Sequence, residues 1–120
     1  ALIPNKNNNP NIWNTGNVTN MSDMFDNASS LTDISGLANW DTAKVTNMNS
    51  MFYNDTALTD ISPIAGWNVS SVTATAGGTT SSNNKFYQMF YSVPSNVTSG
   101  FVFTNRAGSI DSSGTYVVNT

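Results

Sequence analysis

The chain of 120 residues contains no cysteine, no histidine and no glutamate, and it has only four basic side chains. The absence of cysteine excludes disulfides and thiolate metal sites. A histidine for base catalysis, a cysteine nucleophile and a glutamate are therefore all missing. We therefore predict that the chain is not an enzyme and that it carries neither a cofactor nor a metal.

Clustered basic charge and long apolar runs are missing as well. The four basic residues are scattered and the formal net charge is −3, so the chain lacks the positive patch of a nucleic-acid-binding protein. No apolar run approaches the ~18 residues of a membrane-spanning segment. We predict no nucleic-acid partner and no membrane insertion by this segment, and we expect the isolated domain to be a monomer.

The chain is rich in amides and hydroxyls, and its tryptophans are regularly spaced. It contains 19 Asn, 16 Ser and 15 Thr. Trp13, Trp40 and Trp67 are its only tryptophans and lie 27 residues apart. Segments 13–39 and 40–66 are identical at 15 of 27 positions. A fixed period of roughly 20–50 residues is typical of units that stack to bury a shared core.

Each unit changes from a helical to an extended pattern. In residues 18–28 apolar side chains recur at spacings of three and four, which predicts a short helix with its methionines in the core. In residues 31–37 they recur at every third position, which suits a short strand followed by a bend. Such strands would pair in parallel about 4.8 Å apart. We predict an α/β fold: a short leucine-rich-repeat-like solenoid of 27-residue units, each a helix plus a short parallel strand, with an atypical C-terminal β cap.

The chain is interpreted as one domain, residues 1–120, with four parts. Val72 opens a third unit, but its Met89-Phe90 pair is displaced by 11 residues, which predicts an insertion. The cap contains two expected strands, Phe101–Phe103 and Tyr116–Val118, on either side of a turn-rich stretch. The four parts are a lead-in at 1–11, repeat units at 12–72, an interrupted third unit at 73–92, and the cap at 93–120.

A long motif recurs in register within the repeats. Trp40 to Phe52 reads Trp-Asp-Thr-x-x-Val-Thr-Asn-Met-x-x-Met-Phe. Trp13 to Phe25 repeats it, with Asn14, Gly16 and Asn17 in place of Asp41, Ala43 and Lys44. The motif closely resembles that of the BspA-like leucine-rich-repeat surface proteins, especially the versions found in lactobacilli and related Gram-positive bacteria.

The resemblance covers about residues 12–73 together with Met89-Phe90, and residues 91–120 have no recognised counterpart. It implies an extracellular protein, usually anchored to the cell wall through parts of the chain not present here. It also implies that the protein attaches bacteria to host surfaces, matrix proteins, mucus or other microbes.

The aromatic cluster at residues 86–91 is one candidate ligand-binding surface. Helical spacing would place Tyr87 and Tyr91 on one face, with Phe86, Met89 and Phe90 directed inward. Tyrosines beside Asn and Ser suit binding of a sugar or a peptide. The alternative is that both tyrosines pack beneath the insertion or the C-terminal strands.

Asp33 and Asp60 form the second candidate site, because they occupy equivalent positions one repeat apart. Stacking would bring the two carboxylates together as a ladder for Ca²⁺ or another ligand. The alternative is that they are loop carboxylates that accept backbone amide bonds. Two carboxylates lack the dense Asp and Asn ligand set of a calcium loop, so we predict no metal.

These features together favour an extracellular adhesion module on a bacterial cell surface. Its expected partners are host glycans, mucin or extracellular-matrix protein, recognised without covalent chemistry. The alternative is a passive spacer or stalk with no ligand of its own. We expect specificity to lie between Thr73 and Tyr91, where the repeat is interrupted.

Overall fold

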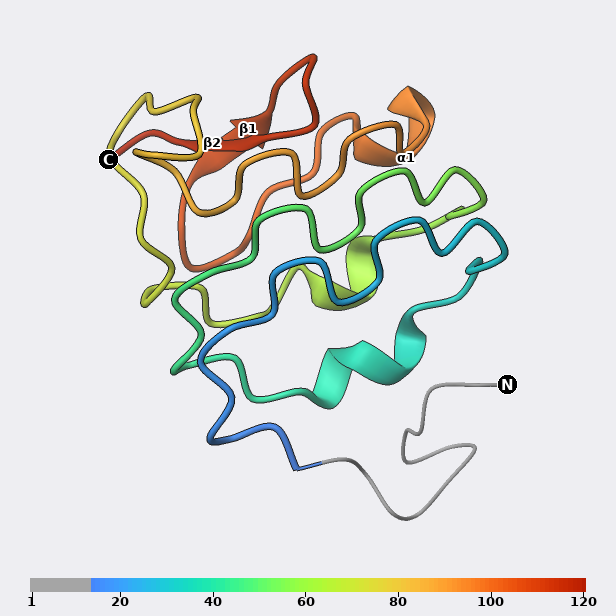
Figure 1. The fold of residues 1–120 in the computed structure, drawn as a ribbon, viewed down its shortest axis with the longest axis horizontal. Helices are drawn as coiled ribbons and strands as arrows, with labels where there is room; N and C mark the ends of the chain where they lie inside the picture. The colour runs from blue at the N-terminus through green and yellow to red at the C-terminus, as the bar shows by residue number, and fades with distance from the viewer. Residues whose placement is uncertain (1–13) are drawn as a thin grey trace.

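The computed structural model describes residues 14–120, and most of this length consists of turns. Two short 3-10 helices, η1 (Ser35–Asn39) and η2 (Ser62–Ile64), precede a single α-helical turn, α1 (Ser95–Thr98). Strands β1 (Gly108–Ile110) and β2 (Tyr116–Val118) pair antiparallel in register from Gly108 opposite Val118. Figure 1 shows three winding segments in layers, with the β1–β2 pair at the far end.

The predicted α/β leucine-rich-repeat-like solenoid is wrong. Residues 18–28 form consecutive turns instead of a helix, and the expected strand at 31–37 leads into η1. Within residues 14–120 the one sheet is the antiparallel pair β1–β2. Parallel pairing between units is limited to an isolated bridge between Asn20 and Asn47.

Left-handed residues explain why the turns do not merge into a helix. An α-helix needs φ near −60° at every residue, whereas Asp23 and Asn27 have φ of 59° and 57°. Asn and Asp tolerate this conformation better than most side chains. Turns of this kind also repeat apolar side chains every three or four residues, so the sequence pattern resembled that of a helix. The same conformation recurs at Ser50, Asn54, Gln88 and Ser92.

Three equivalent segments, which we call the first row (18–28), the second row (45–55) and the third row (83–93), lie side by side (Figure 1). Alternate backbone N–H groups of one row donate to carbonyls of the next over 2.7–3.0 Å. Met21 donates to Asn47 in this way, and Asn54 donates to Tyr91. Backbone groups that a helix would satisfy internally are therefore satisfied between rows.

The register between rows changes once. The side-chain amide of Asn54 donates to Oδ1 of Asn27, which lies 27 residues earlier in the chain. The backbone N–H of Tyr87 instead donates to Oδ1 of Asn49, which lies 38 residues earlier. The difference of 11 residues equals the length of the predicted insertion. The extra residues form a loop outside the stack, and an antiparallel bridge between Ala74 and Asn84 joins the two ends of this loop.

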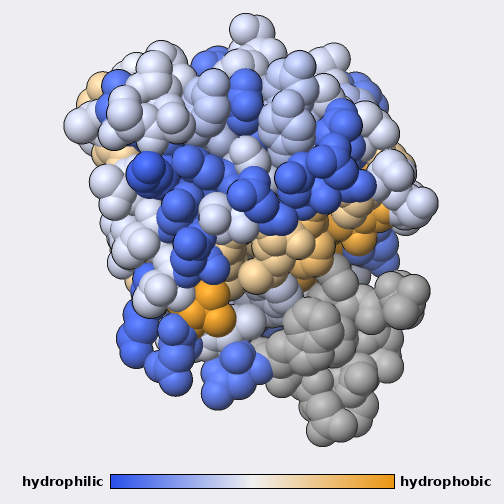
Figure 2. Space-filling view, viewed as in Figure 1, coloured by the Kyte–Doolittle hydropathy of each residue, from blue (hydrophilic) through white to orange (hydrophobic). Residues whose placement is uncertain are grey.

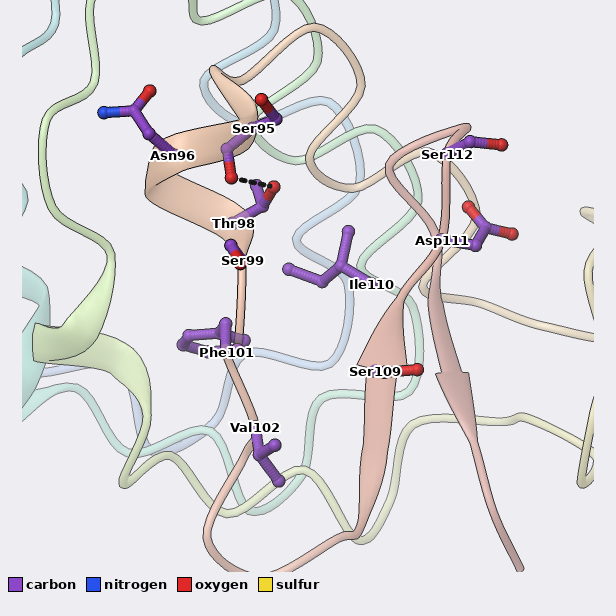
Figure 3. Close-up of a pocket in the computed structure, with 11 residues that line it drawn as sticks. Ser95, Asn96, Thr98, Ser99, Phe101, Val102, Ser109, Ile110, Asp111 and Ser112 are labelled. Atoms are coloured by element: carbon purple, nitrogen blue, oxygen red, sulfur yellow. Dashed lines mark hydrogen bonds between the residues drawn. The ribbon is translucent and has the colours of Figure 1, made fainter.

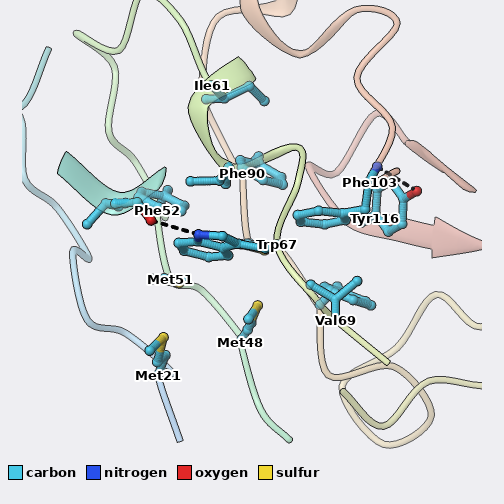
Figure 4. Close-up of a cluster of buried hydrophobic side chains, with 14 of the residues drawn as sticks. Met21, Met48, Met51, Phe52, Ile61, Trp67, Val69, Phe90, Phe103 and Tyr116 are labelled. Carbon is cyan, nitrogen blue, oxygen red and sulfur yellow. Dashed lines mark hydrogen bonds between the residues drawn. The ribbon is translucent and has the colours of Figure 1, made fainter. Parts of the chain in front are cut away.

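Stacked tryptophan side chains connect successive repeat units. The rings of Trp40 and Trp67 lie 6.3 Å apart and are nearly parallel, at 3°. Both are buried, and the indole N–H of Trp67 donates to the carbonyl of Leu37 over 2.8 Å (Figure 4). The prediction of buried, stacked tryptophans is confirmed for this pair, whereas Trp13 lies outside the described residues.

Phenylalanines and methionines fill the space between the rows and the helices behind them. Phe25, Phe52 and Phe90 form a continuous stack with centroid separations of 5.6 and 5.8 Å. Met24 is 43 % exposed, so the prediction that every methionine of the repeats is core is wrong at this position. The first row has no further described row beyond it, whereas the inner rows are covered on both sides. The buried methionines are Met21, Met48, Met51 and Met89.

The C-terminal part caps the third row without copying it. Tyr116–Val118 is a strand as expected, but Phe101–Phe103 is not, and β1 lies within the stretch expected to be a turn. Arg106 fastens this part to the third unit, because its guanidinium donates to three carbonyls at 2.6–3.1 Å. Those carbonyls belong to Val69, Val72 and Ala74.

The surface shown in Figure 2 is largely hydrophilic, with a narrow band of hydrophobic side chains across it. The exposed large hydrophobic side chains of the described part are Met24, Tyr91 and Val102. No helix within residues 14–120 combines the length and the apolar character needed to cross a membrane.

Candidate functional site

Tyr91 lies at the surface beside the junction of the third row and the cap. It is 37 % exposed, and its ring stacks on Tyr53 of the second row, with centroids 4.7 Å apart and an angle of 16°. The carbonyl of Tyr91 accepts the N–H of Asn54 over 2.7 Å. The ring and the backbone are therefore both held by the neighbouring row, so the exposed part of the ring is presented in a fixed orientation.

Tyr87 does not form the predicted helical pair with Tyr91. Residues 84–91 are turns, and Gln88 between the two tyrosines has a φ of 50°. The i, i+4 geometry that placed both rings on one helix face is therefore absent, and the ring stacked on Tyr91 is that of Tyr53. Tyr87 is half-buried, while Phe86, Met89 and Phe90 are buried as predicted.

Asp33 and Asp60 are exposed and occupy equivalent places before η1 and η2. Oδ1 of Asp33 accepts the N–H of Ser35 over 2.8 Å, and Oδ1 of Asp60 accepts that of Ser62 over 2.9 Å. Hydrogen bonds from Ser35 hold the pKa of Asp33 below its ordinary value, although repulsion from Asp60 opposes this. Hydrogen bonds from Ser62 lower the pKa of Asp60 in the same way.

These bonds match the interpretation of Asp33 and Asp60 as loop carboxylates that accept backbone amides. Within residues 14–120, no group of three or more His, Cys, Asp or Glu side chains is placed to hold a metal ion. Asp60 lines a shallow depression of about 300 Å³ beside Val97 and Phe101. Tyr91 does not line that depression, so the two candidate sites do not share a cavity.

A groove that the sequence did not indicate runs between α1 and the end of β1. We call it the cap groove. It consists of two adjoining depressions of about 620 and 350 Å³, and the smaller one reaches Tyr91 and Ser92. Figure 3 shows Ile110 directed between α1 and β1, with Asp111 and Ser112 beyond it. Both depressions share Ser95, Thr98, Ile110, Asp111 and Ser112.

The far wall of the groove is a tight turn organised by Asp111. Its Oδ1 accepts three hydrogen bonds, from the N–H and hydroxyl of Ser113 and from the N–H of Thr115. Gly114 within this turn has a φ of 79°, and its carbonyl accepts the N–H of Phe90 over 2.8 Å.

No other residue fits at Gly114 without displacing the turn. A Cβ there would lie 2.5 Å from the backbone carbon of Phe90, and the positive φ alone disfavours a side chain. Close approach of the turn to the third row is what places Asp111 and Tyr91 on the same depression.

The lining of the cap groove is polar but almost uncharged. It includes several hydroxyls and one amide, each of which can hydrogen-bond to a ligand. Asp111 is its one acidic residue, and no lysine or arginine lines it. Arg106 lies outside the groove and is engaged with the backbone carbonyls of Val69, Val72 and Ala74. The hydroxyl- and amide-bearing lining residues are Ser92, Ser95, Asn96, Thr98, Ser99, Ser109 and Ser112.

Of the four residues predicted to bind ligand, only Tyr91 lines the cap groove. Apart from Phe90, the other lining residues come from segment 92–114, where the repeat gives no basis for an interpretation. Two stretches of the sequence could have indicated this polar groove: the serine-rich stretch that follows Tyr91, and the Asp111-Ser-Ser-Gly114 turn. Sequence spacing alone does not show that these two stretches face each other.

The model of a protein family described as Mycoplasma protein of unknown function, DUF285, matches residues 3–99. The matched range includes the three rows and α1 but ends before β1 and β2. No curated protein matches the chain, and no solved structure matches it.

Proposed function

The chain belongs to the DUF285 family, and from this membership together with the cap groove we propose that it is an adhesion module of a bacterial surface protein. Its ligand would be an uncharged glycan of a host or microbial surface, including the glycans carried by mucin. Binding would be non-covalent and extracellular. The closer relation to BspA-like proteins of lactobacilli is part of the same proposal.

Family membership supports the surface location. DUF285 is a repeat family that occurs in BspA-like surface proteins. A protein on the cell surface is exposed to the glycans of hosts and other microbes, and this supports a role in attachment. The family description assigns no ligand, so the ligand class is argued from the groove alone.

The observation that carries the proposal is the position of Tyr91 at one end of a hydroxyl-lined groove. A tyrosine ring offers a flat apolar face and a polar tip, and a sugar ring has apolar C–H faces edged by hydroxyls. Ser92 and Ser112 line the same depression as Tyr91 and supply donors and acceptors for sugar hydroxyls. Binding sites commonly combine apolar contact with a few placed polar groups in this way.

Charge favours an uncharged ligand. An anionic sugar would meet Asp111 without a lysine or arginine among the lining residues to compensate. Three donors already engage Oδ1 of Asp111, which limits its use as an anchor for a cation. Neutral hydroxyl-rich ligands avoid both problems.

The test is a screen of the 120-residue chain on arrays of glycans, mucins and matrix proteins. We expect binding to neutral glycans, weakened roughly 10- to 100-fold by Tyr91→Ala, because an aromatic anchor is the type of residue that dominates such interfaces. Met24→Ala is the control, since Met24 is exposed on the first row and does not line the groove.

Tyr87→Ala separates the site predicted from the sequence from the site in the structure. Unchanged binding would restrict the site to the cap groove, and reduced binding would extend it along the third row. Binding that survives Tyr91→Ala would contradict the proposed site. Failure to bind any arrayed surface would favour the passive spacer.

A further inference from the structure

Asp55 ends the second row and is the one buried residue of residues 14–120 with a carboxyl, ammonium or guanidinium group. Its fractional exposure is 0 %. The equivalent residue of the first row, 27 positions earlier, is Ala28. After the 38-residue shift between the second and third rows, the equivalent residue is Val93, which is also buried. A carboxyl group therefore occupies a position that the neighbouring rows fill with apolar side chains.

The two oxygens of Asp55 are in different situations. Oδ1 accepts the backbone N–H of Ala28 over 2.7 Å, which joins the second row to the first. Oδ2 is buried, and no described residue donates a hydrogen bond to it. A buried carboxylate with one donor is poorly compensated for the water it has lost, so the charged form is disfavoured.

Among residues 14–120, no positive charge compensates for this burial. Asp26, near the end of the first row, adds like-charge repulsion. Residues 86–98, which include most of the third row and α1, contain no acidic or basic side chain; their titratable groups are the phenols of Tyr87 and Tyr91. Burial and the charge of Asp26 together raise the pKa of Asp55 to about 7, although the Ala28 bond opposes the shift.

We propose that Asp55 is a pH-sensitive lock on the stacked rows, which holds them together when protonated and favours their opening when ionised. The ionised carboxylate gains hydration if the rows separate, whereas the neutral acid gains little. The proposal concerns the stack itself and does not depend on ligand binding at the cap groove.

The lock has a consequence for Tyr91. Tyr53, whose ring supports Tyr91, lies two residues before Asp55 in the same row. Opening of the second row would therefore remove one support of the exposed ring.

The direction of the pH effect follows from the raised pKa. An unfolded chain releases this proton near pH 3.8, whereas the folded chain keeps it until about pH 7. The contribution of Asp55 to stability should therefore be largest below about pH 4, decline as the pH rises to about 7, and level off above that. Asp33 and Asp60 act in the opposite direction, but only below about pH 4, because their pKa values are lowered.

The decisive experiment compares urea unfolding of the wild-type chain and Asp55→Asn from pH 3.5 to 8. We expect the wild-type folding equilibrium constant to fall by up to about tenfold per pH unit between pH 4 and 7. Asp55→Asn keeps an acceptor for the Ala28 amide but cannot ionise, so its curve should be nearly flat there. Equal pH dependence in the two proteins would overturn the proposal.

Asp26→Asn is the matched control, because it removes a neighbouring charge and leaves Asp55 in place. The stability of this variant should still decline as the pH rises, but the decline should end at a lower pH than in the wild-type chain. If Asp55→Asn does not fold, Asp55→Ala copies the residue of the first row and should give the same flat curve.

Carboxyl ¹³C NMR of the wild-type chain needs no variant. The Asp55 resonance should titrate with a midpoint near 7. A midpoint below about 5 would contradict the lock, since the folded state would then not retain the proton.

Discussion

The stacked rows and the C-terminal cap use their polar groups differently. In the rows, alternate backbone amides bond to the next row, and side chains such as Asn27 and Asn54 bond to each other across the repeat. In the cap, a short antiparallel pair, a one-turn helix and a turn around Asp111 meet without repetition. The cap groove lies where these three pieces meet.

The comparison shows why repetition and ligand binding separate in this molecule. A repeated row leaves few unsatisfied groups, because each position faces its own counterpart one unit away. Where the repeat ends, the serines that follow Tyr91 have no counterpart, and Tyr91 itself stacks on its counterpart Tyr53 but has no following row to cover it, so these side chains remain at the surface. The rows therefore provide a stable scaffold, and the cap provides a surface with distinctive chemistry.

The largest expected difference tests how end rows differ from inner rows. Met24 and Met51 occupy the same repeat position, but Met24 is 43 % exposed and Met51 is fully buried. Met51→Ala should lower the free energy of unfolding by ~2–5 kcal/mol through cavity formation. Met24→Ala should change it by less than ~0.5 kcal/mol. Urea denaturation measures both, and similar losses would mean that inner and end rows pack alike.

A second, smaller effect tests the attachment of the cap. Arg106→Ala leaves three carbonyls without their donor and should cost ~1.5–3 kcal/mol. Hydrogen exchange should accelerate in β1 and β2 more than in the first row. Arg106→Lys is the control, because an ammonium cannot reproduce the planar fork and should recover only part of the loss. Uniform acceleration across the chain would show that rows and cap unfold as one unit.

The smallest effect comes from Asp33 and Asp60 on the repeat surface. Their lowered pKa values mean that they stabilise the fold above about pH 4 and lose this contribution as the pH falls further. The double substitution to Asn should therefore flatten the acid side of a plot of Tm against pH, by less than about 3 °C. If the double substitution instead changed the pH dependence of Tm between pH 4 and 7, the assignment of that pH dependence to Asp55 would be contradicted.

The repeat was readable from the sequence, but its backbone was not. The spacing of Trp40 and Trp67 correctly predicted two buried, stacked rings. The apolar pattern of residues 18–28 did not predict turns, because three- and four-residue spacing is common to a helix and to successive turns. Asp23 and Asn27 were the informative residues, since both favour turns and left-handed conformations over helix interiors.

The candidate site was less predictable than the repeat. Tyr91 was identified as a potential ligand contact, but it was expected to share a helix face with Tyr87 and instead stacks on Tyr53. Asp55 gave no signal, because a single polar residue at an apolar repeat position is also compatible with an exposed loop. Its burial depends on the rows on both sides of it.

By itself, the sequence determined the period, the aromatic residues that stack within the repeats and the scarcity of charge, because these depend on residue identity and spacing along one chain. The tertiary structure alone decided that the rows bond to each other instead of forming helices. It also placed Asp111 and Tyr91 on one groove and buried Asp55. Each of these depends on segments distant in sequence, whose approach is determined by packing and backbone hydrogen bonding throughout the fold.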